Sequence, residues 1–343
     1  MFDHDDTSMP MTRRAALRLA AGGVAGLGGL TLLPNAGLAA KLKPSVLLWG
    51  SSSLGSTGYV IIETLAAMVN KKTKLRNSSM STSGGAENMA LIGEGVIHFG
   101  QTTSSDWPAA TKGEKPYHHP IKANQMFAYT IWNMPPIVRA DSDIRTFADF
   151  KGKRIMPSKP TSSTGAMWKV LFQAAGLDRQ VDWNYGSWRE TYNALKAGKV
   201  DVIPALITNG RPSPLVTELL VSQKVRAIEV PKDVLDKAHA MNPGILSVKV
   251  STGAWGGDGH EILSPTFSGV VGVHPDLDPE ICYQVTKAVF ENAAEIRKVG
   301  VQLQDIDLKF GVDYLLAEYP VNAGAARYFK EKGVWRSELK IAS

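Results

Sequence analysis

Groups of serine, threonine and glycine residues recur along the chain, and each follows a short apolar run. Hydroxyl groups and free backbone N–H groups at the start of a helix bind anions through hydrogen bonds and the helix dipole. These loops therefore indicate a site for a small organic anion, such as a dicarboxylate or an amino acid. The hydroxyl side chains expected to face it are Ser52, Ser53, Ser56 and Thr57 on one side and Ser162, Ser163 and Thr164 on the other. For any one loop, the alternative is that the residues only cap a helix.

Residues that would support catalysis or metal binding do not occur at suitable spacings. The stretch from Gly50 to Thr57 is similar to a phosphate-binding loop, but Ser56 stands where that motif needs lysine. The adjacent pair His118 and His119 gives only a weak metal signal. Arg211, which follows an apolar run, is the best-placed cation. We expect no catalytic residue, no metal and no cofactor, and hence no enzyme.

Composition narrows the class of protein further. The chain has 343 residues, of which 44% are hydrophobic, and its net charge is +6. Lys and Arg are spread along the chain without a run of five, which argues against a nucleic-acid partner. The single cysteine, Cys282, excludes an intramolecular disulfide. A length above about 300 residues predicts two lobes or domains.

The order of apolar runs, polar loops and helical patterns predicts an α/β fold with mainly parallel sheets. The run at 45–49 is typical of a buried strand, and the polar loop after it leads into a helix over about 59–70. The same unit returns several times. Further along, Pro212 is expected in the first turn of a helix, and 280–298 is expected to form one long helix.

Two apolar strands, at 126–132 and 266–273, are expected to cross between lobes. Lobe I then comprises 41–131 plus 266–343, and lobe II comprises 132–265. Two α/β lobes joined by two strands enclose a cleft that can close on a ligand by a hinge motion.

The first forty residues have the pattern of an export signal. Arg13 and Arg14 precede a weakly hydrophobic, glycine-rich stretch without charge, which ends in small residues near Ala40. A twin arginine before such a stretch is typical of Tat export. We therefore expect a Tat-type signal peptide over 1–40 and a mature protein in the periplasm.

The motifs in their order along the chain resemble the TAXI family of TRAP-transporter substrate-binding proteins. The similar stretches are 50–59, 83–88, 95–101, 150–155, 162–165, 194–201 and 323–333. The resemblance implies a two-lobe periplasmic-binding-protein fold of the type II-like class with a hinged cleft. It also implies a ligand such as glutamate or 2-oxoglutarate, and delivery of this ligand to an ion-coupled TRAP permease.

The resemblance also implies a set of ligand-binding residues. They are Ser53, Ser56, Thr57, Tyr59, Gln101, Thr102, Ser162, Ser163, Thr164, Asn209, Gly210 and Arg211. We expect the protein to act as a monomer. Two alternatives stay open: a binding protein that serves an ABC permease or a sensor, and a Tat-exported hydrolase.

Overall fold

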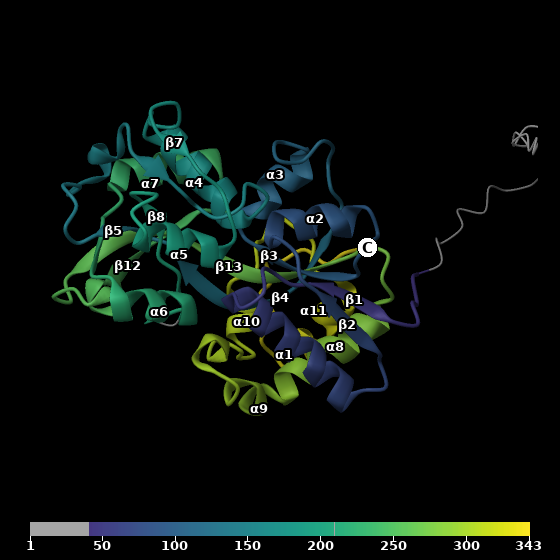
Figure 1. Cartoon of the computed structure of the whole chain (residues 1–343). Helices are drawn as coiled ribbons and strands as arrows, with labels where there is room; N and C mark the ends of the chain where they lie inside the picture. The colour runs from purple at the N-terminus through teal and green to yellow at the C-terminus, as the bar shows by residue number, and fades with distance from the viewer. Residues whose placement is uncertain (1–40, 209) are drawn as a thin grey trace, which may run out of the picture. The chain divides into compact units, whose positions relative to one another are not determined.

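A mixed sheet runs through the middle of the molecule, which the computed structural model describes over residues 41–208 and 210–343 (Figure 1). Its strand order is β10-β9-β4-β13-β3-β1-β2, and β12 pairs with β13. The predicted signal peptide at 1–40 lies outside the described residues.

The first lobe is built around the three parallel strands β2, β1 and β3. Its N-terminal elements are β1 (Leu47–Gly50), α1 (Thr57–Lys72), β2 (Asn77–Met80), α2 (Gly85–Gly93), β3 (Phe99–Thr103) and α3 (Asp106–Lys112). The C-terminal segment returns to this lobe with α8 (Pro279–Glu291), α9 (Ala293–Arg297), the 3-10 turn at Val301–Leu303, α10 (Phe310–Asp313) and α11 (Ala323–Glu331).

Two long strands, β4 (Asn124–Asn133) and β13 (Glu261–Val273), pair antiparallel along the sheet. They lie where the sequence predicts the two crossings, although the exact lobe boundaries stay a prediction. The sequence predicted a mainly parallel sheet. This prediction was wrong, because β13 is antiparallel to both β3 and β4. The antiparallel pairing arises because the chain leaves the first lobe through β4 and returns through β13.

The second lobe holds two smaller sheets, of order β11-β5-β8 and β6-β7. Its strands are β5 (Pro136–Arg139), β6 (Arg154–Ile155), β7 (Asp182–Trp183), β8 (Ile203–Pro204), β9 (Ile207–Thr208), β10 (Arg211–Pro212), β11 (Val225–Ala227) and β12 (Leu246–Ser251). Its helices are α4 (Ser163–Ala174), α5 (Trp188–Lys196), α6 (Pro214–Ser222) and α7 (Lys232–Met241), with 3-10 turns at Phe147–Phe150 and Thr252–Trp255. In Figure 1 these helices lie together, apart from α1 and α8.

Two helix predictions were wrong in detail. Pro212 belongs to strand β10, and α6 begins at Pro214 because the Ser213 hydroxyl accepts a hydrogen bond from the Val216 backbone and caps the helix there. The long helix predicted at 280–298 is divided at Asn292 into α8 and α9.

Helix α1 shows how the sequence positions the polar loops. Ile61, Leu65 and Val69 recur at helical spacing and are fully buried. Ser56 caps the helix by accepting a hydrogen bond from the Tyr59 backbone N–H at 3.2 Å. The buried face therefore fixes the helix on the sheet, and its N-terminus lies at the carboxyl end of β1.

Candidate functional site

The starts of three long helices meet around one cavity of about 30 Å³ between the two lobes. The polar part of its lining comes from the starts of α1, α2 and α4 and from β3: Ser52, Ser56, Gly58, Ser83, Gly84, Gly85, Gln101, Thr103, Ser162, Ser163 and Thr164. The apolar part comes from Trp132, Met134, Trp188, Leu206 and Phe267. A volume of this size holds about two water molecules. We call this form, in which the lobes contact each other beside the cavity, the closed form.

The N-termini of α1, α2 and α4 supply backbone N–H groups and positive dipole ends to the lining. None of the described residues that line this cavity carries a formal charge. Positive potential here comes from backbone dipoles. This is the arrangement by which helix starts bind anions.

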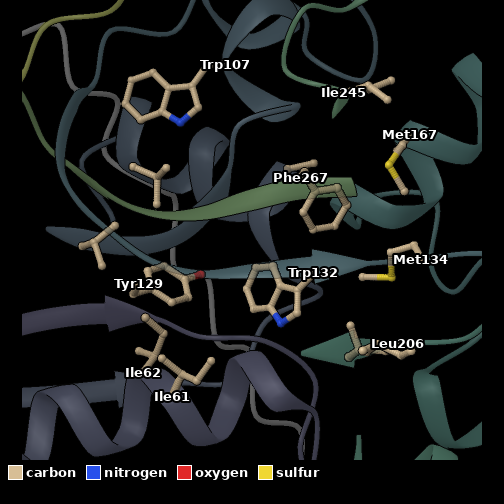
Figure 2. Close-up of a cluster of buried hydrophobic side chains, with 14 of the residues drawn as sticks. Ile61, Ile62, Trp107, Tyr129, Trp132, Met134, Met167, Leu206, Ile245 and Phe267 are labelled. Atoms are coloured by element: carbon tan, nitrogen blue, oxygen red, sulfur yellow. The ribbon is translucent and has the colours of Figure 1, made fainter. Parts of the chain in front are cut away.

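Two of the five apolar lining residues, Trp132 and Phe267, come from the long strands β4 and β13. Figure 2 shows Trp132, Met134, Phe267 and Leu206 gathered around one another. Trp132 is fixed by edge-to-face contacts, with ring centroids 5.5 Å from Tyr129 and 5.8 Å from Phe267. Its indole nitrogen lies on the edge that faces away from Phe267 in this view.

Two buried polar atoms in the lining have no hydrogen-bond partner among the described residues. They are the indole nitrogen of Trp132, whose side chain is 2% exposed, and the Oε1 atom of Gln101, which is 6% exposed. A buried polar group without a partner costs about 1–3 kcal/mol. The indole N–H gains an acceptor if an anion occupies the cavity, and the amide oxygen gains a partner only from a ligand group that donates.

A hydrogen bond from Ser163 to Asp106 joins the lobes beside this cavity. The Ser163 hydroxyl donates to Oδ2 of Asp106 at 2.8 Å, and the backbone N–H of Thr103 donates to the same oxygen at 2.7 Å. Complete burial raises the pKa of Asp106 to about 6, although these hydrogen bonds oppose the shift. We call this contact the Asp106–Ser163 latch.

Further contacts hold the closed form nearby. The Glu87 backbone N–H donates to the Thr161 carbonyl at 3.2 Å. The Asn242 side chain donates to the Ser105 carbonyl at 2.8 Å, and the Ser104 hydroxyl donates to the Gly244 carbonyl at 2.6 Å. Opening the lobes therefore requires the loss of several specific hydrogen bonds.

A second cavity, of about 590 Å³, also has Asp106 in its wall. Its lining includes Lys115, Tyr117, Lys169 and Tyr185. In contrast to the smaller cavity, it is lined by charged side chains, and Lys115 lies exposed. Within the described part of the chain, no group of three or more His, Cys, Asp or Glu residues is arranged to hold a metal ion. The same residues include no helix long and apolar enough to cross a membrane.

Several residues predicted for the site lie together around the smaller cavity. The structure brings Ser56, Gln101, Ser162, Ser163 and Thr164 into its lining. Ser56 and Ser162 also cap α1 and α4, so capping and cavity lining occur in the same residues.

The other predicted residues lie elsewhere. Thr57 is buried in the first turn of α1 but does not line the cavity, Ser53 lines a neighbouring groove, and the Tyr59 side chain lines neither. Thr102 faces away from the cavity.

In the second lobe, Gly210 and Arg211 are exposed and absent from the lining, and Asn209 lies outside the described residues.

The sequence analysis did not predict Asp106, Thr103 or the lining from Ser83 to Gly85 as site residues, although 83–88 is among the stretches that resemble the TAXI family. Thr103 donates to Asp106 through its backbone N–H and its hydroxyl, but no local pattern in the sequence identifies this carboxylate as buried. The apolar lining gave no signal either, because β4 and β13 are buried almost throughout.

Comparison with solved structures shows the same kind of fold at low sequence identity. A protein from Bordetella bronchiseptica RB50 has a TM-score of 0.50 and 16% identity, over 87% of this chain and 91% of that one. The alkanesulfonate-binding protein SsuA from Xanthomonas axonopodis pv. citri, bound to MOPS, has a TM-score of 0.45 and 15% identity over 88% and 98% of the two chains. A TRAP periplasmic solute-binding protein from Sulfitobacter sp. NAS-14.1, with bound β-D-galacturonate, has a TM-score of 0.44 and 12% identity over 78% and 87%.

The family model gives the more specific result. The model of the NMT1-like family matches residues 49–333, which include both lobes and every residue that lines the cavity. The chain therefore belongs to the NMT1-like family, a class of periplasmic solute-binding proteins that work with a small ligand and a membrane permease.

Proposed function

We propose that the protein captures a small organic anion between its lobes in the periplasm and delivers it to an ion-coupled TRAP permease. The observation that carries the proposal is the convergence of three helix N-termini on a cavity between two lobes. The sequence motifs that resemble the TAXI family support the TRAP permease and a glutamate-like or 2-oxoglutarate-like ligand. In this mechanism the ligand bridges the lobes and favours the closed form, and the permease distinguishes closed from open.

The use of the buried hydroxyl groups supports our proposal of a binding role instead of a catalytic one. A nucleophilic serine needs a base that accepts its proton and a site that stabilises the developing charge. The Ser163 hydroxyl donates its hydrogen bond to Asp106 in the other lobe. The backbone N–H and the hydroxyl of Thr103 donate to the same carboxylate oxygen. We propose that this arrangement holds the lobes together and performs no reaction.

Thermal unfolding of the mature protein with a ligand panel tests the proposal. The panel holds glutamate, glutamine, 2-oxoglutarate, C4-dicarboxylates, aliphatic carboxylates and sugars. A ligand at 100 times its dissociation constant adds about 2.7 kcal/mol to the free energy of unfolding. We expect carboxylates to raise the midpoint by about 4 °C and to be recovered unchanged after incubation. Turnover of any ligand would favour the hydrolase alternative, and no shift with any carboxylate would contradict anion binding.

The permease requires a separate measurement. Transport into proteoliposomes that contain the permease should need this protein and an ion gradient, and should proceed without ATP. A requirement for ATP would identify an ABC permease as the partner instead.

Gly58→Ala is expected to weaken binding of the best carboxylate about ten-fold. A Cβ atom at Gly58 would lie 2.1 Å from Oε1 of Gln101, which is the end of a flexible side chain and must move away. The amide would then leave its place in the cavity while the fold persists. Isothermal titration measures the dissociation constant, and thermal unfolding checks the fold. The matched control is Gly253→Ala, whose added methyl meets nothing closer than 3.4 Å; equal affinity of the two variants would count against a role for Gln101.

A further inference from the structure

The cavity between the lobes has a polar end without charged side chains and an apolar part. The polar end is formed by helix starts and by Gln101, and the apolar part by Trp132, Met134, Trp188, Leu206 and Phe267. These two surfaces come from different elements, so they can contact different parts of one ligand. The helix starts fit a single anionic group, and the aromatic and aliphatic side chains fit a hydrocarbon body.

A second carboxylate on the ligand would have no charged partner in this lining. None of the described lining residues is charged, so no Lys or Arg is available for it. Burying an unpaired ionic group costs several kcal/mol. An ammonium group, in contrast, could donate to Oε1 of Gln101, which has no partner among the described residues. The nearest acidic group, Asp106, contacts the lining residues Thr103 and Ser163, and Oδ2 of Asp106 already accepts three hydrogen bonds from them.

The unpaired indole N–H of Trp132 gives the anionic group a specific partner. This N–H can only donate, and it has no acceptor within the described residues. An anion at the helix starts would supply the missing acceptor. The contacts of Trp132 with Tyr129 and Phe267 fix the direction of this donor.

We infer that the ligand is an organic anion with one carboxylate and an apolar body, such as an aliphatic monocarboxylate, and is not a dicarboxylate. This inference rests on the proposed function and narrows its ligand class to monocarboxylates, in place of the dicarboxylates that the TAXI resemblance implies. Trp132 is then a residue that positions the anionic group, and the strand residues around it exclude a second carboxylate.

Four compounds of nearly equal shape test the inference by isothermal titration. The probes are 4-methylpentanoate, succinate, leucine and aspartate. Succinate has a carboxylate in place of the isopropyl group of 4-methylpentanoate, and leucine and aspartate add an ammonium group to each of these. We expect 4-methylpentanoate to bind at least about 100-fold more tightly than succinate, and leucine to bind more tightly than aspartate, since each 1.4 kcal/mol is a factor of ten. Tighter binding of succinate than of 4-methylpentanoate, or of aspartate than of leucine, would overturn the inference and leave the proposed function intact. Binding of none of the four at millimolar concentration would also overturn the inference, and the ligand panel described above then tests the proposed function separately.

Trp132→Phe tests the contact with the anionic group. The phenyl ring retains the aromatic contacts but removes the N–H donor, so affinity for 4-methylpentanoate should fall about ten-fold or more. The matched control is Trp168→Phe, because the Trp168 indole nitrogen is also buried without a partner among the described residues but does not line the cavity. Far-ultraviolet circular dichroism and thermal unfolding establish that both variants fold. An equal loss of affinity in both variants, or no loss in Trp132→Phe, would contradict the assigned role.

Discussion

Gly85→Ala is expected to force the lobes apart and to weaken ligand binding by about 100-fold or more. Gly85 begins α2 and lies against the Asp106–Ser163 latch. An added Cβ atom would lie 2.1 Å from Oδ2 of Asp106 and 2.3 Å from Oγ of Ser163. These distances are far below van der Waals contact, and the two oxygen atoms are held by a hydrogen bond to each other. The latch and the methyl group therefore cannot occupy the same place.

Small-angle X-ray scattering measures this effect without a ligand. The radius of gyration of Gly85→Ala should exceed that of the unsubstituted protein, and isothermal titration with 4-methylpentanoate should give the lower affinity. The exposed Gly253→Ala serves again as the control for a glycine-to-alanine change. If Gly85→Ala keeps both its radius of gyration and its affinity, then the latch does not hold the lobes closed.

Asp106→Asn is expected to change how stability depends on pH. Burial raises the pKa of Asp106 from 3.8 to about 6 in the folded protein. The folded state therefore binds this proton more tightly than the unfolded state, and the stability that results is fully present below about pH 4 and is lost as pH rises through 6. A shift of this size corresponds to about 3 kcal/mol. Asparagine does not titrate, so the stability of the variant does not fall in this way as pH rises.

Urea unfolding between pH 3.5 and 7.5 measures the difference between the two proteins. The free energy of unfolding of the unsubstituted protein, minus that of Asp106→Asn, should fall by about 3 kcal/mol across this range. Burial lowers the pKa values of His98 and His274, which contributes a pH dependence of the opposite sign. Both proteins share these histidines, so their contribution cancels in the difference. A constant difference would show that Asp106 does not carry a raised pKa.

The sequence predicted the elements that carry the polar loops because their signals are local. Helices α1, α2 and α4 have apolar faces at helical spacing, and serine side chains cap the starts of α1 and α4. The family match at residues 49–333 confirms the solute-binding class. The prediction of mainly parallel strand pairing was wrong, because no local pattern in the sequence indicates that β13 runs antiparallel to β3.

The site was only partly predictable because its geometry depends on distant contacts. Gln101 and Thr103 lie two residues apart on β3 and face the cavity, and Thr102 between them faces the other way, as strand geometry requires. Its hydroxyl instead donates to the Val270 carbonyl at 2.8 Å. The choice of face depends on the neighbouring strand β13, which lies far along the chain. The latch is a similar case, since 57 residues separate Asp106 from Ser163.

The small volume of the closed cavity has a consequence for the speed of ligand capture. A space of about 30 Å³ is smaller than an organic anion, so the ligand must enter while the lobes are apart, and the form that closes on it must be wider than the closed form of this structure. The observed association rate should then level off at high ligand concentration, at the rate at which the hydrogen bonds around Asp106 and Asn242 separate. The apparent dissociation constant also contains the fraction of open molecules. A substitution that loosens these contacts would thus speed the capture of ligand and shorten its retention.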